Sequence, residues 1–98
     1  MGKIAMVVVG ALLAGCAADF ELTLLRAAGR TPAPVTVSVL QDADATVLHV
    51  GESTGVNAGA VVVRVNTNPP VECAQVIEAP LSSWYCADGD ASATLEVR

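Results

Sequence analysis

The sequence predicts a small all-β domain, an antiparallel sandwich of about seven short strands with one disulfide bond. Three observations predict it. Apolar and polar residues alternate with a period of two along much of residues 35–98, turn-forming residues interrupt these runs at short intervals, and the same region holds an even number of cysteines, Cys73 and Cys86. A period of two places successive side chains on opposite faces of a strand, and closely spaced turns are typical of sandwiches.

The clearest strand is "ASATLEVR" at 91–98, in which alanine, leucine and valine alternate with polar residues. The same alternation, or a β-branched apolar run, marks "VTVSV" (35–39), "ATVLHV" (45–50), "AVVVRVN" (60–66) and "CAQVIEA" (73–79). Asp88-Gly89 predicts a two-residue hairpin turn, because both residue types tolerate positive φ. This turn would pair "SSWYCA" (82–87) with 91–98.

Residues 19–29 are ambiguous. "FELTLLR" can alternate as a strand with Phe20 and Leu22 on one face, or form a helix capped by Asp19 and ended by Gly29. The neighbouring β patterns favour the strand. The prolines of "RTPAP" make 30–34 a connector, and "GESTGVNAG" at 51–59 is interpreted as a flexible connection.

Composition and charge narrow the function classes. The 98 residues are 53% hydrophobic, yet there is one Phe, one Trp and one Tyr, so the core is made of small side chains and is thin. The net charge is -5, and the arginines are scattered among carboxylates. Nucleic acid is therefore not expected as a partner, and an acidic chain would be repelled by anionic lipids.

The N-terminus has the order of an export leader, with Lys3 followed by an apolar segment from Ile4 to Ala14 and then small residues. Only about 15 residues in this region are free of charge, fewer than the roughly 20 that a helix needs to cross a bilayer. A permanent membrane span is therefore disfavoured.

The leader ends in Leu13-Ala14-Gly15-Cys16, which resembles the lipobox of bacterial lipoproteins at all four positions. The resemblance implies that residues 1–15 are a signal peptide that is removed, that Cys16 is lipidated, and that 16–19 form a short tether to a β domain at 20–98. It places the protein outside the cytoplasm, anchored to the cell membrane or the outer membrane. The alternatives are that Cys16 is an ordinary buried thiol, or that a general signal peptidase cuts nearby, for example after Ala18.

Lipidation of Cys16 leaves an even number of cysteines in an exported chain. Oxidising conditions then favour a Cys73–Cys86 disulfide over two free thiols. Closing this loop should stabilise the fold by roughly 3 kcal/mol, a large share of the stability of so small a domain.

The pattern "WYC" before a glycine turn and "ATLEV" faintly resembles the last hairpin of an immunoglobulin-like sandwich. The likeness is limited, because Trp84 lies two residues before Cys86, whereas the core tryptophan of that fold lies between well-separated cysteines. Trp84 and Tyr85 point to opposite faces of a strand, so one is expected in the core. The other is a candidate contact for a ligand or partner.

Little else in the sequence indicates chemistry. His49 is the one histidine and the one candidate base, but a lone histidine on a strand is usually structural or exposed. The pairs Asp42/Asp44 and Asp88/Asp90 are explained by turns, so no metal site and no cofactor is expected. The sequence predicts a non-catalytic envelope lipoprotein with a structural or protein-interaction role, and a small solute- or ion-binding module is the alternative.

Overall fold

The computed structural model describes residues 18–98 as eight β-strands. They are β2 (Phe20–Ala28), β3 (Val37–Gln41), β4 (Asp44–Leu48), β5 (Ser53–Val56), β6 (Gly59–Val65), β7 (Val71–Ile77), β8 (Leu81–Asp88) and β9 (Ala91–Val97). Within that range no helix has the length and hydrophobicity needed to cross a membrane.

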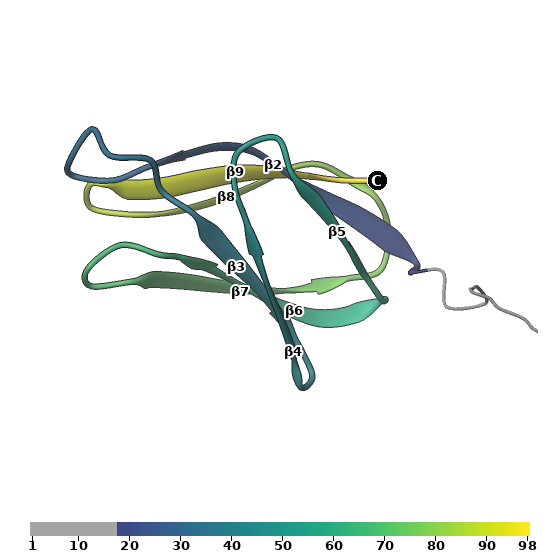
Figure 1. The fold of residues 1–98 in the computed structure, drawn as a ribbon. Coiled ribbons are helices and arrows are strands. Elements are labelled where there is room, and N and C mark those ends of the chain that lie inside the picture. The colour runs from purple at the N-terminus through teal and green to yellow at the C-terminus, as the bar shows by residue number, and fades with distance from the viewer. Residues whose placement is uncertain (1–17) are drawn as a thin grey trace, which may run out of the picture.

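The strands form two antiparallel four-stranded sheets that pack as a sandwich (Figure 1). One sheet has the order β5-β2-β9-β8 and the other β4-β3-β6-β7. The predicted all-β sandwich is thus confirmed, with eight strands in place of about seven. Its first two strands, β2 and β3, lie in different sheets, whereas an immunoglobulin domain keeps its first two strands in one sheet. The resemblance to that fold therefore extends to the two-layer architecture and not to the strand order.

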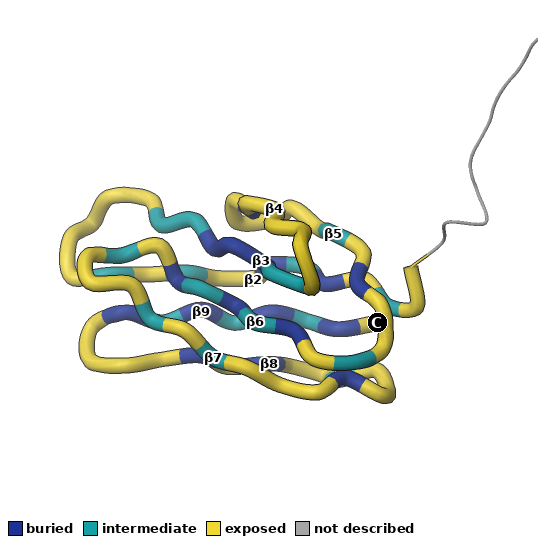
Figure 2. Tube along the Cα trace, turned by 90° about the horizontal axis from the view of Figure 1, so that it is seen from below, coloured by how far each residue is buried: buried dark blue, intermediate teal, exposed yellow. Residues whose placement is uncertain are grey.

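The core lies between the sheets and follows the period-two pattern. Buried and half-buried residues alternate strictly along β9, as Figure 2 shows along the chain trace. Sixteen apolar residues are buried within residues 18–98, and they include seven valines and a single aromatic residue, Trp84. The core is accordingly thin, as the composition predicts.

The strand prediction for residues 19–29 is confirmed by β2, whose Leu22 and Leu24 are fully buried. The interpretation of residues 51–59 as a flexible connection is wrong. Ser53–Val56 forms β5, which pairs with the start of β2. The sequence does not reveal this strand, because only Val56 of its four residues is buried and apolar and polar residues do not alternate along it.

The hairpin predicted between residues 82–87 and 91–98 is also present, as β8 paired with β9. The turn lies one residue later than predicted, because Asp88 pairs with Ala91 and leaves Gly89 and Asp90 at the centre. Gly89 has a φ of 60° and Asp90 is not among the residues with positive φ. A positive φ at the first central residue alone is the pattern of a type II′ turn, for which glycine is preferred.

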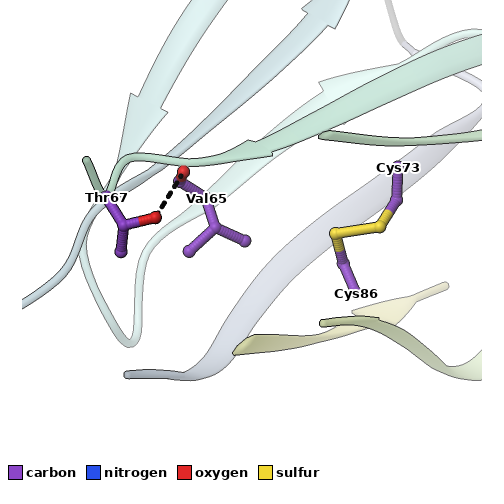
Figure 3. The surroundings of a disulfide bond; sticks show 4 residues. All are labelled: Val65, Thr67, Cys73 and Cys86. Atoms are coloured by element: carbon purple, nitrogen blue, oxygen red, sulfur yellow. Dashed lines mark hydrogen bonds between the residues drawn. A yellow bond between two sulfur atoms is a disulfide. The ribbon is translucent and has the colours of Figure 1, made fainter. Parts of the chain in front are cut away.

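The predicted disulfide joins the two sheets at one side of the sandwich (Figure 3). Cys73 lies on β7 and Cys86 on β8, and these are edge strands of different sheets. Their Cα atoms are 5.8 Å apart, and Cys86 is fully buried. The bond therefore ties together two edges that share no backbone ladder.

We expect the double substitution Cys73→Ala/Cys86→Ala to lower the free energy of unfolding by about 3 kcal/mol, because it releases a loop closed over 13 residues in the unfolded chain. Urea unfolding of both proteins without reductant measures the loss. Dithiothreitol should lower the midpoint of the wild type to that of the variant and leave the variant unchanged. Equal midpoints for the oxidised wild type and the variant would contradict the expectation.

Candidate functional site

The two aromatic residues singled out by the sequence have different surroundings. Trp84 is 1% exposed and packs in the core, so it is excluded as a contact residue. Tyr85 is 66% exposed on the outer face of its sheet, where it lies opposite Thr94. One aromatic residue is thus in the core and one is exposed, as the alternation predicts. Tyr85 does not line the hollow described below.

Cys16, the predicted lipidation site, lies outside the described residues. The chain enters β2 at the end of the sandwich that also carries the C-terminus, which we call the entry end (Figure 1). There the Asp19 carboxylate accepts a hydrogen bond from the Ala58 amide at 2.8 Å. Backbone hydrogen bonds in both directions join Glu21 to Arg98. The chain is therefore tied to the domain from Asp19 onward.

The opposite end of the sandwich carries a hollow, which we call the distal groove. Its volume is about 590 Å³. Three loops line it: the β2–β3 connection, the β6–β7 connection and the β8–β9 turn. These are the segments containing "RTPAP", "NTNPP" and "ADGD", which the sequence marks as separate turns. The strand topology brings them together at one end.

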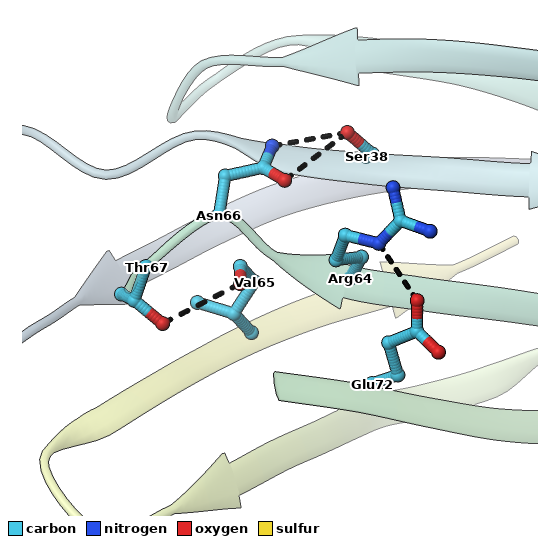
Figure 4. A network of polar contacts seen from close by, with 6 residues as sticks. All are labelled: Ser38, Arg64, Val65, Asn66, Thr67 and Glu72. Carbon is cyan, nitrogen blue, oxygen red and sulfur yellow. Dashed lines mark hydrogen bonds and ion pairs between the residues drawn. The ribbon is translucent and has the colours of Figure 1, made fainter. Parts of the chain in front are cut away.

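Side chains brace the walls of the distal groove. The amide nitrogen of Asn66 donates to Ser38 at 3.0 Å (Figure 4). It also donates to Thr36 at 3.0 Å. Thr67 donates to the carbonyl of Pro69 at 2.9 Å. A Cβ at Gly29 would lie 3.1 Å from the Thr67 methyl group, so the β2–β3 connection packs closely against the β6–β7 connection. These contacts fix the loops of the groove in the unbound protein, so a ligand would not have to order them on binding.

The charges at the groove come from three residues. Arg30 of the β2–β3 connection pairs with Asp90 of the β8–β9 turn at 3.4 Å, and Asp88 lines the groove beside it. Both partners are mostly exposed, so the pair contributes little to stability. Its polar atoms remain accessible to a partner.

The other candidate residues do not gather into a site. Asp42 lies in the β3–β4 turn and Asp44 begins β4, whereas Asp88 and Asp90 line the groove at the β8–β9 turn. Within residues 18–98 no three residues of the types that bind metal come together.

His49 lies just beyond β4 and pairs with Glu52 on the β4–β5 connection. The Glu52 carboxylate accepts a hydrogen bond from the His49 amide at 2.8 Å and contacts the His49 ring nitrogen Nδ1 at 3.1 Å. The hydrogen bond from the His49 amide, and to a smaller extent the contact with the His49 ring, lower the pKa of Glu52 below that of an ordinary glutamate. Both side chains are more than half exposed, so the pair is a surface turn and not an enclosed base.

Comparison with protein-family models, with curated proteins and with solved structures finds no match to this chain. The arguments on function therefore rest on the residues and their geometry.

We expect the pKa of Glu52, followed by NMR of its carboxyl carbon, to lie below that of an exposed glutamate. Substitution His49→Ala should raise it part of the way, because the amide hydrogen bond at residue 49 remains. Since the folded pKa is lowered, the pair stabilises the fold above the unfolded pKa, and this contribution disappears as the pH falls through the folded pKa. A pKa equal to that of a glutamate in a short unstructured peptide would contradict the assignment.

Proposed function

We propose that this protein is a bacterial lipoprotein, anchored outside the cytoplasm through Cys16, that contacts another envelope protein through its distal groove without catalysing a reaction. One observation carries the proposal. The end at which the chain enters the domain and the end that carries the groove lie at opposite ends of β2, which spans nine residues.

The tether geometry supports this orientation. Four residue steps separate Cys16 from Phe20, where β2 begins, and they reach at most about 14 Å. The entry end would therefore remain next to the lipid surface. β2 then carries the chain about 26 Å away from it before the first groove loop begins. An anchored domain in this orientation presents the groove away from the membrane.

The character of the groove favours a protein partner. It is open, its walls are connecting loops on a β scaffold, and its polar groups include the exposed Arg30–Asp90 pair. Loops held by a rigid scaffold are where many β-sandwiches bind other proteins. The single histidine belongs to the β4–β5 connection and not to the groove lining, which supports a non-catalytic role.

A small solute is a second candidate ligand, and the groove volume favours it. Ligand pockets commonly measure roughly 300–1,000 Å³, and the groove, at about 590 Å³, falls in that range. A thermal-shift panel of small solutes separates the candidates, because a solute-binding groove would raise the melting temperature with its ligand.

Substitution Cys16→Ser should leave the protein without acyl groups, because the serine cannot take the lipid. Metabolic labelling with an alkyne fatty acid, followed by purification of the protein, measures the change. Substitution Ala17→Ser is a matched control and should keep the label. A Cys16→Ser protein labelled as strongly as the wild type would contradict lipidation of Cys16.

The groove assignment can be tested in cells with a photo-crosslinking residue at Thr31 or Asn68, both exposed at the groove. We expect a discrete protein adduct from these positions, and a clear reduction of it when Arg30→Glu is added. A crosslinker at Ser83, exposed on β8 outside the groove, is the control and should give no such adduct. The same adduct from Ser83, or none from either groove position, would argue against the groove as the contact site.

A further inference from the structure

The outer face of the sheet β4-β3-β6-β7 is apolar, and we call it the neutral face. Residues directly opposite each other on antiparallel strands share a face. Leu40 lies opposite both Ala45 and Val62, and Val62 lies opposite Ala74, so one apolar row crosses all four strands. The outward apolar residues are Leu40, Ala45, Val47, Ala60, Val62, Ala74 and Val76.

The outer face of the other sheet differs. Its outward positions on β9 are Ser92, Thr94 and Glu96, and Thr23 of β2 lies opposite Glu96. The valines of the neutral face are by contrast open to solvent, with Val47 54% and Val76 64% exposed. The other sheet also exposes Leu25 and Tyr85, but the outward residues of its inner strand β9 are polar, so a continuous apolar row crosses only the neutral face.

The neutral face carries no net charge although the chain is acidic. Among the outward residues of its four strands only Arg64 and Glu72 are charged, and they form an ion pair at 2.7 Å (Figure 4). The whole chain has a net charge of -5. Two copies that approach through their acidic surfaces repel each other. Two copies that approach through the neutral face avoid this electrostatic repulsion.

We propose that the neutral face is the surface through which two copies of this chain pair in the plane of the membrane. The inference rests on the proposed lipid anchor. Two copies anchored in one bilayer are related by a two-fold axis along the membrane normal. With the entry end at the lipid, the strands of each domain run away from the membrane. The neutral faces then lie parallel to the axis and can meet while both anchors stay in the bilayer.

Other arrangements fit the observations less well. Antiparallel pairing of two edge strands, β7 with β7, would turn the second copy end over end and remove its anchor from the shared bilayer. A lipid surface is a poor occupant, because the face has no aromatic residue and its one basic residue, Arg64, is paired with Glu72.

The size of the face predicts a weak contact in solution. Four strands about 4.8 Å apart and about 17 Å long cover roughly 300 Å² per copy, well below the area of a stable dimer interface. Anchoring confines both copies to a layer next to the bilayer and raises their effective concentration. The pair therefore forms on the membrane, where it presents two distal grooves side by side and facing the same way.

Cysteine substitutions in the anchored, non-reduced protein test the pairing. Val62→Cys on the inner strand β6 places a thiol at the centre of the neutral face, and Thr94→Cys places one at the equivalent inner strand β9 of the other sheet. Both residues are half-buried, so the two variants are matched. Treatment of isolated membranes with a short bismaleimide should give about tenfold or more covalent dimer from Val62→Cys than from Thr94→Cys.

A second substitution separates true pairing from chance encounters. Ala74→Glu, exposed on the edge strand β7, adds a negative charge to the neutral face of each copy and should reduce the Val62→Cys dimer to the Thr94→Cys level. The fold of each variant is checked by its melting temperature. Equal dimer from the two thiols, or a Val62→Cys adduct with a protein of different mass, would overturn the proposal.

Fractionation of the cells in the same experiment tests the lipid anchor separately from the pairing. If the protein is membrane-bound and the two thiols crosslink equally, pairing fails and the anchor stands. If the protein is recovered in the soluble fraction, the anchor fails and the pairing that depends on confinement fails with it.

Discussion

The Cys73–Cys86 bond joins two edge strands that belong to different sheets, and the rest of the sandwich depends on that connection. The core beneath it is made mainly of valine, leucine and alanine, and β7 contributes only Ile77 as a fully buried apolar side chain. A domain of about 80 residues with so little apolar volume gains marginal stability from burial alone. The covalent bond keeps β7 and β8 together where apolar contacts are few. This requirement for an oxidised bond also agrees with an exported chain.

Much of this fold could be predicted from the sequence because its inner faces are regular. The alternation in β9, β6 and β2 identifies both the strands and the residues that face the core, and the cysteine count identifies the bond. The strand prediction failed where a strand buries few side chains, because its sequence then shows no alternation of apolar and polar residues. β5 buries only Val56 and is held by backbone pairing to β2, which single-residue preferences do not reveal. The β8–β9 turn is displaced by one residue because Gly89, and not Asp88, takes the positive φ.

The candidate site was harder to predict than the fold. The sequence predicts three separate turns in the proline- and glycine-containing segments. Only the strand order shows that these turns lie together at one groove. Trp84 was a candidate contact because alternation alone cannot say which of two neighbouring aromatic residues faces the core. The neutral face could not be predicted from the sequence either, because the apolar row from Ala45 to Ala74 depends on the register of four strands. Both features are properties of pairing between distant segments and not of any local motif.

The central claim is that a folded, oxidised domain is held at a membrane by its first mature residue. Intact mass spectrometry of the protein purified from its native envelope, with an alkylating agent and no reductant, tests it most directly. The account predicts a chain that begins at Cys16, carries acyl groups there, and is two hydrogens lighter than its reduced form, with Cys73 and Cys86 unalkylated. An unacylated chain beginning at Met1, with all three thiols alkylated, would contradict it.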